Sequence, residues 1–207
     1  MINIIDYEMG NLRSVEKAFE SLGFKAQVSA KPDDIRSTDK IVLPGVGAFR
    51  DCINNLRNGG FVEPLLEHIA AGKPMLGICV GMQMLFDESE EFGRHKGLGL
   101  IPGKVVRFPS GMVENGERLK VPHMGWNNID IVKPSPIFKG IANSSFVYFV
   151  HSYYCAAENS SDVAAACHYG DIEFSASIWR DNIMATQFHP EKSQDVGLQI
   201  FRNFAEL

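Results

Sequence analysis

Short, strand-like runs rich in apolar residues, which alternate with helical patterns, constrain the fold of this chain more than any other feature. The runs cover residues 2–5, 24–28, 40–43 and 74–78. Continuous apolar strands of this length are typical of a parallel sheet that is covered on both faces, because neither face of such a strand meets water. The first half of the chain therefore predicts parallel strands, and those at 2–5 and 74–78 are expected to be buried.

Segments with helical spacing separate these runs. Apolar residues recur three and four apart over 12–22, where Gly23 would end the helix, and over about 62–71, where Gly72 would end it. A shorter helix-compatible segment, 82–86, follows the fourth run. Alternating strands and helices predict an α/β fold with a doubly wound, mostly parallel central sheet flanked by helices.

The second half has a different pattern. Glycine and proline are dense over 93–116, and a closing helix is expected over 195–206. Five shorter strand-like runs lie between them, at 127–132, 145–150, 163–168, 177–180 and 183–187. We expect antiparallel edge strands laid against the same sheet. No linker or internal repeat interrupts the sequence, so residues 1–207 are expected to form a single domain.

Composition excludes several classes of protein. Hydrophobic residues make up 45% and charged residues 22%, a balance typical of globular domains and not of disordered or fibrous chains. The net charge of -5 argues against nucleic acid as a partner, and no apolar run reaches the length that spans a bilayer. The chain opens without a basic, signal-like segment, so a cytoplasmic location is expected.

The four cysteines lack the spacing of a disulfide framework or a zinc site, so reduced thiols and no metal are expected. Cys79 has a special setting in the segment Gly77-Ile78-Cys79-Val80-Gly81. A strand precedes it and a helix-compatible segment follows, which is the context of a nucleophile elbow. The sharp turn would project the sulfur clear of the backbone and place it at a helix N-terminus, where the helix dipole favours thiolate. The alternative is a buried core thiol.

A cysteine nucleophile needs a general base, and His189 is the best placed histidine. It follows the run 183–187 in the segment Gln187-Phe188-His189-Pro190-Glu191. Proline biases the preceding residue toward extended geometry, in which residues two apart share a face. Glu191 could then orient the imidazole of His189. A solvated surface pair is the alternative for these two residues.

The segments GICVGMQMLF and QFHPEKS, around Cys79 and around His189 with Glu191, resemble the class I (triad-type) glutamine amidotransferases. The resemblance covers essentially the whole chain. Further segments narrow it to one branch of that family: DYEMGNLRSV, PGVGAF, PHMGWN and FVHSY. Glu8 departs from the pattern, because a glycine is expected at that position of the first segment.

The resemblance implies that Cys79 attacks the side-chain amide of glutamine, while His189 moves protons and Glu191 orients it. The oxyanion would be bound by the amide of Val80 and by one amide of the glycine-containing loop, at Val46 or Gly47. Three residues would bind glutamine: Gln83 by its side chain, and Ser152 and Tyr153 by their backbone. For Gln83 alone, an exposed helix residue is the simpler interpretation.

The resemblance also implies a heterodimer and no cofactor. The ammonia would pass to a (β/α)8-barrel cyclase subunit, with Asn11, Trp126 and Lys192 near the interface. Trp126 could equally be a core aromatic residue. Three other interpretations remain open from the sequence: a glutaminase serving a different synthase, a cysteine peptidase or chaperone-like α/β protein, and a binding subunit without catalysis.

Overall fold

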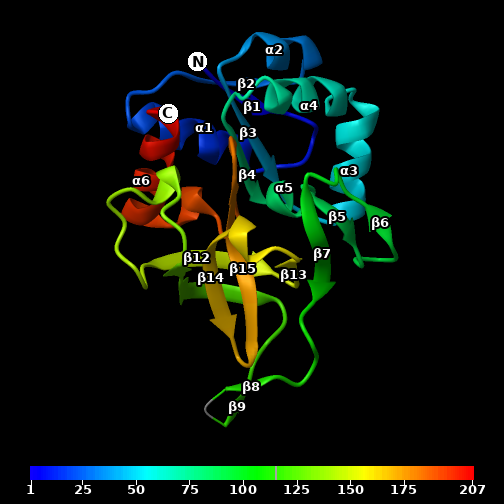
Figure 1. Cartoon of the computed structure of the whole chain (residues 1–207), viewed down its shortest axis with the longest axis vertical. Helices are drawn as coiled ribbons and strands as arrows, with labels where there is room; N and C mark the ends of the chain where they lie inside the picture. The colour runs from blue at the N-terminus through cyan, green and yellow to red at the C-terminus, as the bar shows by residue number, and fades with distance from the viewer. Residues whose placement is uncertain (115) are drawn as a thin grey trace.

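The computed structural model describes residues 1–114 and 116–207, and its centre is a 12-stranded sheet within those residues (Figure 1). Five strands that are joined by parallel pairing form one half of the sheet. In spatial order they are β2 (Ala26–Ser29), β1 (Ile2–Ile5), β3 (Lys40–Gly45), β4 (Met75–Cys79) and β16 (Ile183–Thr186).

Antiparallel pairing begins at β16 and continues through most of the other half of this sheet. The path runs through β15 (Ile172–Arg180), β13 (Tyr153–Ala157), β7 (Ile101–Arg107), β5 (Phe86–Ser89) and β6 (His95–Lys96). Beside β15, β14 (Val163–Tyr169) pairs with it and β11 (Asp130–Ile131) pairs with β14. Two small two-stranded antiparallel sheets complete the strands: β10 (His123–Asn128) with β12 (Phe146–His151), and β8 (Val113–Glu114) with β9 (Glu117–Arg118).

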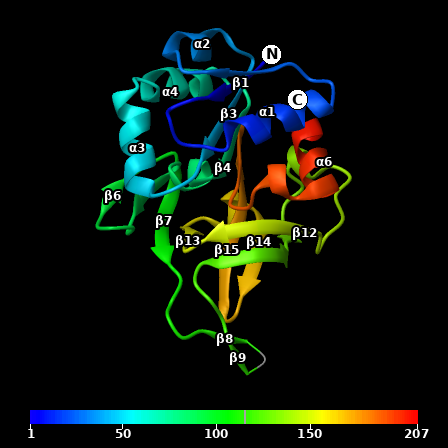
Figure 2. The ribbon, with the colours of Figure 1, turned by 180° about the vertical axis from the view of Figure 1, so that it is seen from behind.

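Helices cover both faces of the parallel half, as two opposite views show (Figures 1 and 2). On one side lie α1 (Leu12–Ser21) and α6 (Gln194–Ala205); on the other lie α2 (Pro32–Ser37), α3 (Phe49–Asn58) and α4 (Val62–Ala70). Single turns are α5 (Val80–Gln83), η1 (Pro136–Phe138), η2 (Ser160–Asp162) and η3 (Pro190–Lys192). The expected doubly wound α/β fold with antiparallel strands is confirmed.

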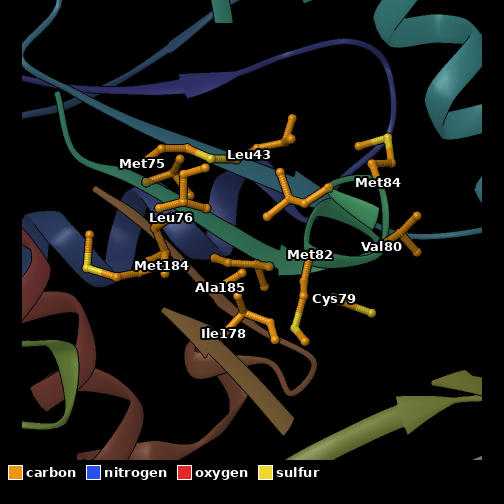
Figure 3. Close-up of a cluster of buried hydrophobic side chains, with 14 of the residues drawn as sticks. Leu43, Met75, Leu76, Cys79, Val80, Met82, Met84, Ile178, Met184 and Ala185 are labelled. Carbon is orange, nitrogen blue, oxygen red and sulfur yellow. The ribbon is translucent and has the colours of Figure 1, made fainter. Parts of the chain in front are cut away.

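The core lies between the sheet and these helices. Every residue of β4 is buried, and Figure 3 shows the apolar cluster around it, with Cys79 at the end of the strand. Between α1 and α6, the rings of Phe19 and Phe201 pack with their centroids 4.6 Å apart. Among residues 1–114 and 116–207, no helix combines the length and apolar composition that crossing a membrane requires.

Several expected elements differ from the structure. The strand expected over 24–28 is β2, which begins two residues later, and that expected over 177–180 is only the end of β15. The single strand expected over 127–132 is divided in the structure between the end of β10, which occupies residues 123–128, and the two-residue β11. The expected helix 82–86 is α5, which ends at Gln83 because Phe86 begins a strand.

Among the elements that were missed are α2, α3, β5, β7 and β13. The signal for α3 is present, since Phe49, Cys52, Ile53 and Leu56 are buried at helical spacing. The segment Pro44–Gly47 before it indicates a loop, so the helix was not expected. The strand β7 lies in the glycine- and proline-dense part of the chain, where pairing with β13 decides the conformation and local propensity does not.

The register of β4 fixes the position of Cys79. Gly45 of β3 lies opposite Cys79, and Thr186 of β16 lies opposite Ile78. At Gly81 a Cβ atom would lie 1.9 Å from the carbonyl oxygen of Leu43, so only glycine lets the turn after Cys79 pack on β3.

Replacing Gly81 by alanine should therefore separate the turn from β3. We expect Gly81→Ala to lower the free energy of unfolding by more than about 3 kcal/mol, measured by chemical denaturation. Gly72→Ala is the control, because Gly72 has φ of +74° but nothing within 4 Å of an added Cβ; it should cost only about 1 kcal/mol of backbone strain. Equal losses in the two variants would contradict this packing.

Candidate active site

Cys79 occupies a strained turn between β4 and α5. Its backbone lies at φ 54° and ψ −112°, in a region that non-glycine residues rarely adopt, and the residue is 5% exposed. The expected sharp strand-to-helix turn is thus present. The helix that follows has only four residues, so the dipole effect expected at the sulfur is that of a single turn.

His189 and Glu191 form a buried pair. The imidazole Nδ1 donates to Glu191 Oε1 at 2.8 Å, and the two side chains are 2% and 1% exposed. The alternative of a solvated surface pair is therefore wrong. The expected reason for their proximity is also wrong, because Pro190–Lys192 is a 3-10 turn and not an extended strand. The turn, and not strand alternation, brings Glu191 back to the ring.

The backbone of His189 is held from two sides. Its N–H donates to the carbonyl of Tyr148 in β12 at 3.0 Å, and the Ser193 hydroxyl donates to its carbonyl at 2.7 Å. The same hydroxyl accepts from the Tyr148 N–H at 3.0 Å. Ser193 thus joins η3 to β12 and fixes the approach of the imidazole.

Opposing effects set the charge of His189. Burial acts to lower the pKa of its imidazole, but the negative charges of a Cys79 thiolate and of Glu191 outweigh burial and raise that pKa to about 10. Within the described residues, Nε2 has no formed hydrogen bond, although Cys79 is close enough for its charge to act on the ring. A thiolate at Cys79 therefore favours an imidazolium at His189.

A cavity of about 430 Å³ opens over Cys79, a size typical of small-molecule sites. Nine of the predicted residues line it: Val46, Gly47, Cys79, Val80, Gln83, Ser152, Tyr153, His189 and Lys192. Glu191 lies behind His189 as its hydrogen-bond partner, whereas Asn11 and Trp126 do not line the cavity. The fold thus brings together segments that follow β3, β4, β12 and β16.

The loop after β3 carries the residues expected to bind an oxyanion. The Tyr7 hydroxyl donates to the carbonyl of Pro44 at 2.6 Å, and the Cys52 thiol donates to the carbonyl of Val46 at 3.3 Å. Gly47 has φ of +91°, which favours glycine. Because the C=O and N–H of a trans peptide point in opposite directions, the N–H of Gly47 is directed away from Cys52.

Gln83 is buried, so the interpretation as an exposed helix residue is wrong. Its Nε2 donates to the carbonyl of Tyr153 at 3.1 Å and to Gln187 Oε1 at 3.1 Å. The carbonyl of Ser152 accepts from the N–H of Phe108 at 3.1 Å. Both carbonyls of the Ser152-Tyr153 segment are thus already engaged within the chain, which leaves other groups of this segment to meet a ligand.

Sequence reasoning missed a buried pair of histidines beside this segment. His151 Nδ1 lies 2.9 Å from the Tyr153 carbonyl, which only accepts, so this nitrogen donates and Nε2 accepts from His123 Nδ1 at 2.9 Å. Burial lowers the pKa of His123 to about 4, and burial together with His123 lowers that of His151 to about 3. Both histidines stand in quoted motifs, but neither motif indicates that they meet.

The three residues expected at a partner interface lie in different settings. Trp126, on β10, is 46% exposed, so it is not a core residue. Its ring meets that of Tyr148 edge-on at 6.0 Å, and the Lys192 ammonium lies 5.7 Å from the same Tyr148 ring. Trp126, Tyr148 and Lys192 therefore form one surface patch. Asn11 is partly exposed immediately before α1.

The departure at Glu8 has a structural consequence. Glu8 adopts φ of 69°, a conformation that glycine accepts without strain and glutamate does not. Its N–H donates to Asp6 Oδ1 at 3.0 Å, which closes the turn locally. The positive φ explains why a glycine is expected at this position. Glu8 does not line the cavity around Cys79.

Comparison with known proteins identifies the family. The model of the class I glutamine amidotransferases matches residues 3–207, so the chain belongs to this family, as the sequence motifs predicted. The chain is similar to the imidazole glycerol phosphate synthase subunit HisH of Syntrophotalea carbinolica, with 62% identity over 207 residues and all of both chains. The subunit of the same name from Geobacter sulfurreducens is 60% identical over 206 residues, covering 100% of this chain and 98% of that one.

Solved structures agree on the fold. A crystal structure of a glutamine amidotransferase superposes with a TM-score of 0.75 at 19% identity, covering 100% of this chain and 99% of that one. PurLQS from Thermotoga maritima superposes with a TM-score of 0.73 at 17% identity, covering 99% and 97%. At such identities the likeness concerns the fold alone.

The histidine pair should make stability depend on pH. Because the pKa of His151 is lower in the folded chain than the usual 6.5, the unfolded chain binds the extra proton, so stability falls as pH drops below 6.5 toward 4. In His151→Gln, the slope of the unfolding free energy against pH should decrease by up to about 1.4 kcal/mol per pH unit over this range. Denaturant titrations at each pH measure it, and an unchanged slope would contradict a neutral buried pair.

Proposed function

We propose that this chain hydrolyses glutamine to glutamate and ammonia as the glutaminase subunit of an imidazole glycerol phosphate synthase. The observation that carries the proposal is the position of Cys79, which stands in a strained turn at the floor of a cavity, facing the buried His189–Glu191 pair. The similarity of the whole chain to HisH subunits supports the choice of synthase.

In the first half of the reaction the Cys79 thiolate attacks the side-chain amide carbon of glutamine. The resulting tetrahedral oxyanion would be bound by backbone N–H groups of Val80 and of the loop at Val46 or Gly47. His189, held as an imidazolium by Glu191, gives its Nε2 proton to the departing nitrogen. Ammonia leaves, and a γ-glutamyl thioester remains on the sulfur.

In the second half, water attacks the thioester. His189 is now neutral, and because Glu191 accepts from Nδ1, its Nε2 carries the lone pair that takes a proton from this water. A second oxyanion forms in the same place and collapses to glutamate and the Cys79 thiolate. Substrate glutamine would be held by Gln83, Ser152 and Tyr153, which border the cavity.

The ammonia would serve a partner. We propose a (β/α)8-barrel cyclase subunit, which uses ammonia and a phosphoribulosyl intermediate to form imidazole glycerol phosphate and an aminoimidazole carboxamide ribonucleotide in histidine biosynthesis. The Trp126–Tyr148–Lys192 patch suits a docking role, because Trp126 is exposed and Lys192 also borders the cavity. Asn11 is proposed for the same interface. The chain would act as a single domain in the cytoplasm, where its four free thiols would stay reduced.

The nucleophile can be tested directly. We expect Cys79→Ala to reduce glutamine hydrolysis at least about 10³-fold while leaving the thermal unfolding midpoint within a few degrees, because only the reacting sulfur is removed. Cys167→Ala is the control, since this buried thiol lies in β14 and does not line the cavity. Glutamate release by Cys79→Ala at the rate of the unmodified chain would exclude the mechanism.

The partner can be tested by binding and activation. We expect the isolated chain to hydrolyse glutamine slowly and the cyclase to accelerate it, because an uncoupled glutaminase wastes its substrate. Trp126→Ala should raise the dissociation constant for the cyclase roughly tenfold or more. Val132→Ala, an exposed residue after β11, should leave it unchanged. Rapid hydrolysis without the cyclase, or equal affinity of both variants, would argue against this coupling.

A further inference from the structure

A residue outside the expected set lies beside the reacting sulfur. In the parallel register of β16 with β4, Thr186 is opposite Ile78; Gln187 comes directly after Thr186, as Cys79 comes directly after Ile78. Gln187 is fully buried, and its backbone N–H donates to the carbonyl of Ala176 at 2.8 Å. Its side-chain Nε2 lies 3.8 Å from Cys79 Sγ.

The neighbours of Gln187 decide which end of its amide faces the sulfur. The carbonyl of Tyr153 can only accept, so the group of Gln83 that lies 3.1 Å from it is the NH2 group. That same NH2 group lies 3.1 Å from the side chain of Gln187, which must therefore present its oxygen there. The NH2 group of Gln187 is left on the other side, toward Cys79.

We propose that Gln187 is a further residue of the catalytic apparatus, which donates an N–H to the Cys79 sulfur and stabilises its thiolate. The inference rests on the proposed function of Cys79 as nucleophile. A thiolate that is 5% exposed has little water around it and needs donors from the protein.

The neutral amide of Gln187 can donate to the sulfur at every stage of the reaction, whereas His189 cannot. His189 gives up its Nε2 proton when ammonia leaves, so it is not a constant donor to the sulfur. The Gln187 amide keeps its protons throughout, and it is in place when the thioester collapses and Cys79 leaves as a thiolate. We therefore expect its removal to affect both the formation and the release of the thiolate.

Among the described residues, the charge of Cys79 acts on four titratable groups: Tyr7 from the loop after β1, Cys52 from α3, Cys155 from β13 and His189. Glu91 and Lys192 also line the cavity over Cys79. Burial raises the pKa of the Tyr7 hydroxyl and of the Cys52 and Cys155 thiols, which keeps all three neutral near pH 7. A substitution at Gln187 leaves each of these groups in place.

The test is the pH dependence of alkylation of Cys79 by iodoacetamide in the full chain, followed by mass spectrometry of the Cys79 peptide. In Gln187→Met, which keeps the length of the side chain but has no N–H, the midpoint of the profile should rise by about one pH unit. With the cyclase present, kcat for glutamine hydrolysis should fall about tenfold while KM changes little. Cys155→Ser is the control, because Cys155 touches only the oxygen end of Gln187, at 3.9 Å.

Gln187→Glu is the second variant, because it retains the acceptor for Gln83 and replaces the donor by an oxygen. Its midpoint should rise further than that of Gln187→Met, because the carboxylate also adds negative charge beside the sulfur. An unchanged midpoint in this variant would overturn the proposal even if the methionine variant does not fold. Profiles that match the unmodified chain in the folded variants would overturn the proposal. Absence of glutamine hydrolysis in the unmodified complex would instead refute the proposed function, which separates the two failures.

Discussion

The parallel pairing of β4 with β3 on one side and β16 on the other is the constraint on which the rest of the structure depends. Parallel strands end at the same edge of a sheet, so Gly45, Cys79 and the segment after Thr186 meet there without long connections. The close packing of the turn on β3 requires glycine at Gly81. A shift of register in either pair would separate the sulfur from His189.

At this edge of the sheet, the cost of burying charged groups is offset by their interactions with one another. Removing Cys79, His189 and Glu191 from water would be costly for any one of them alone as an ion, but each charge has a partner of opposite sign or a donor. The neutral groups matter as much. The amides of Gln83 and Gln187 and the pair His123–His151 form a chain of hydrogen bonds that meets at the Tyr153 carbonyl and ends at the sulfur.

The sequence predicted the parts of this account that depend on local pattern. The apolar run into Cys79 predicted a buried strand ending in a turn, and the segment from His189 to Glu191 predicted their pairing. It failed where contacts between distant segments decide the outcome. Nothing local indicates that Gln187 reaches Cys79, because that contact depends on strand register. The helix α3 is a different case, because its apolar residues have a helical spacing that is present in the sequence itself.

In the proposed mechanism, the edge of the sheet holds a cysteine positioned for acyl transfer from glutamine. The most direct measurement is the mass of the chain quenched in acid during turnover of glutamine with the cyclase present, followed by peptide mapping. We predict a γ-glutamyl adduct, confined to the peptide that contains Cys79, which disappears when glutamine is exhausted. A chain that releases ammonia without such an adduct, or that carries it on Cys52, Cys155 or Cys167, would contradict the account.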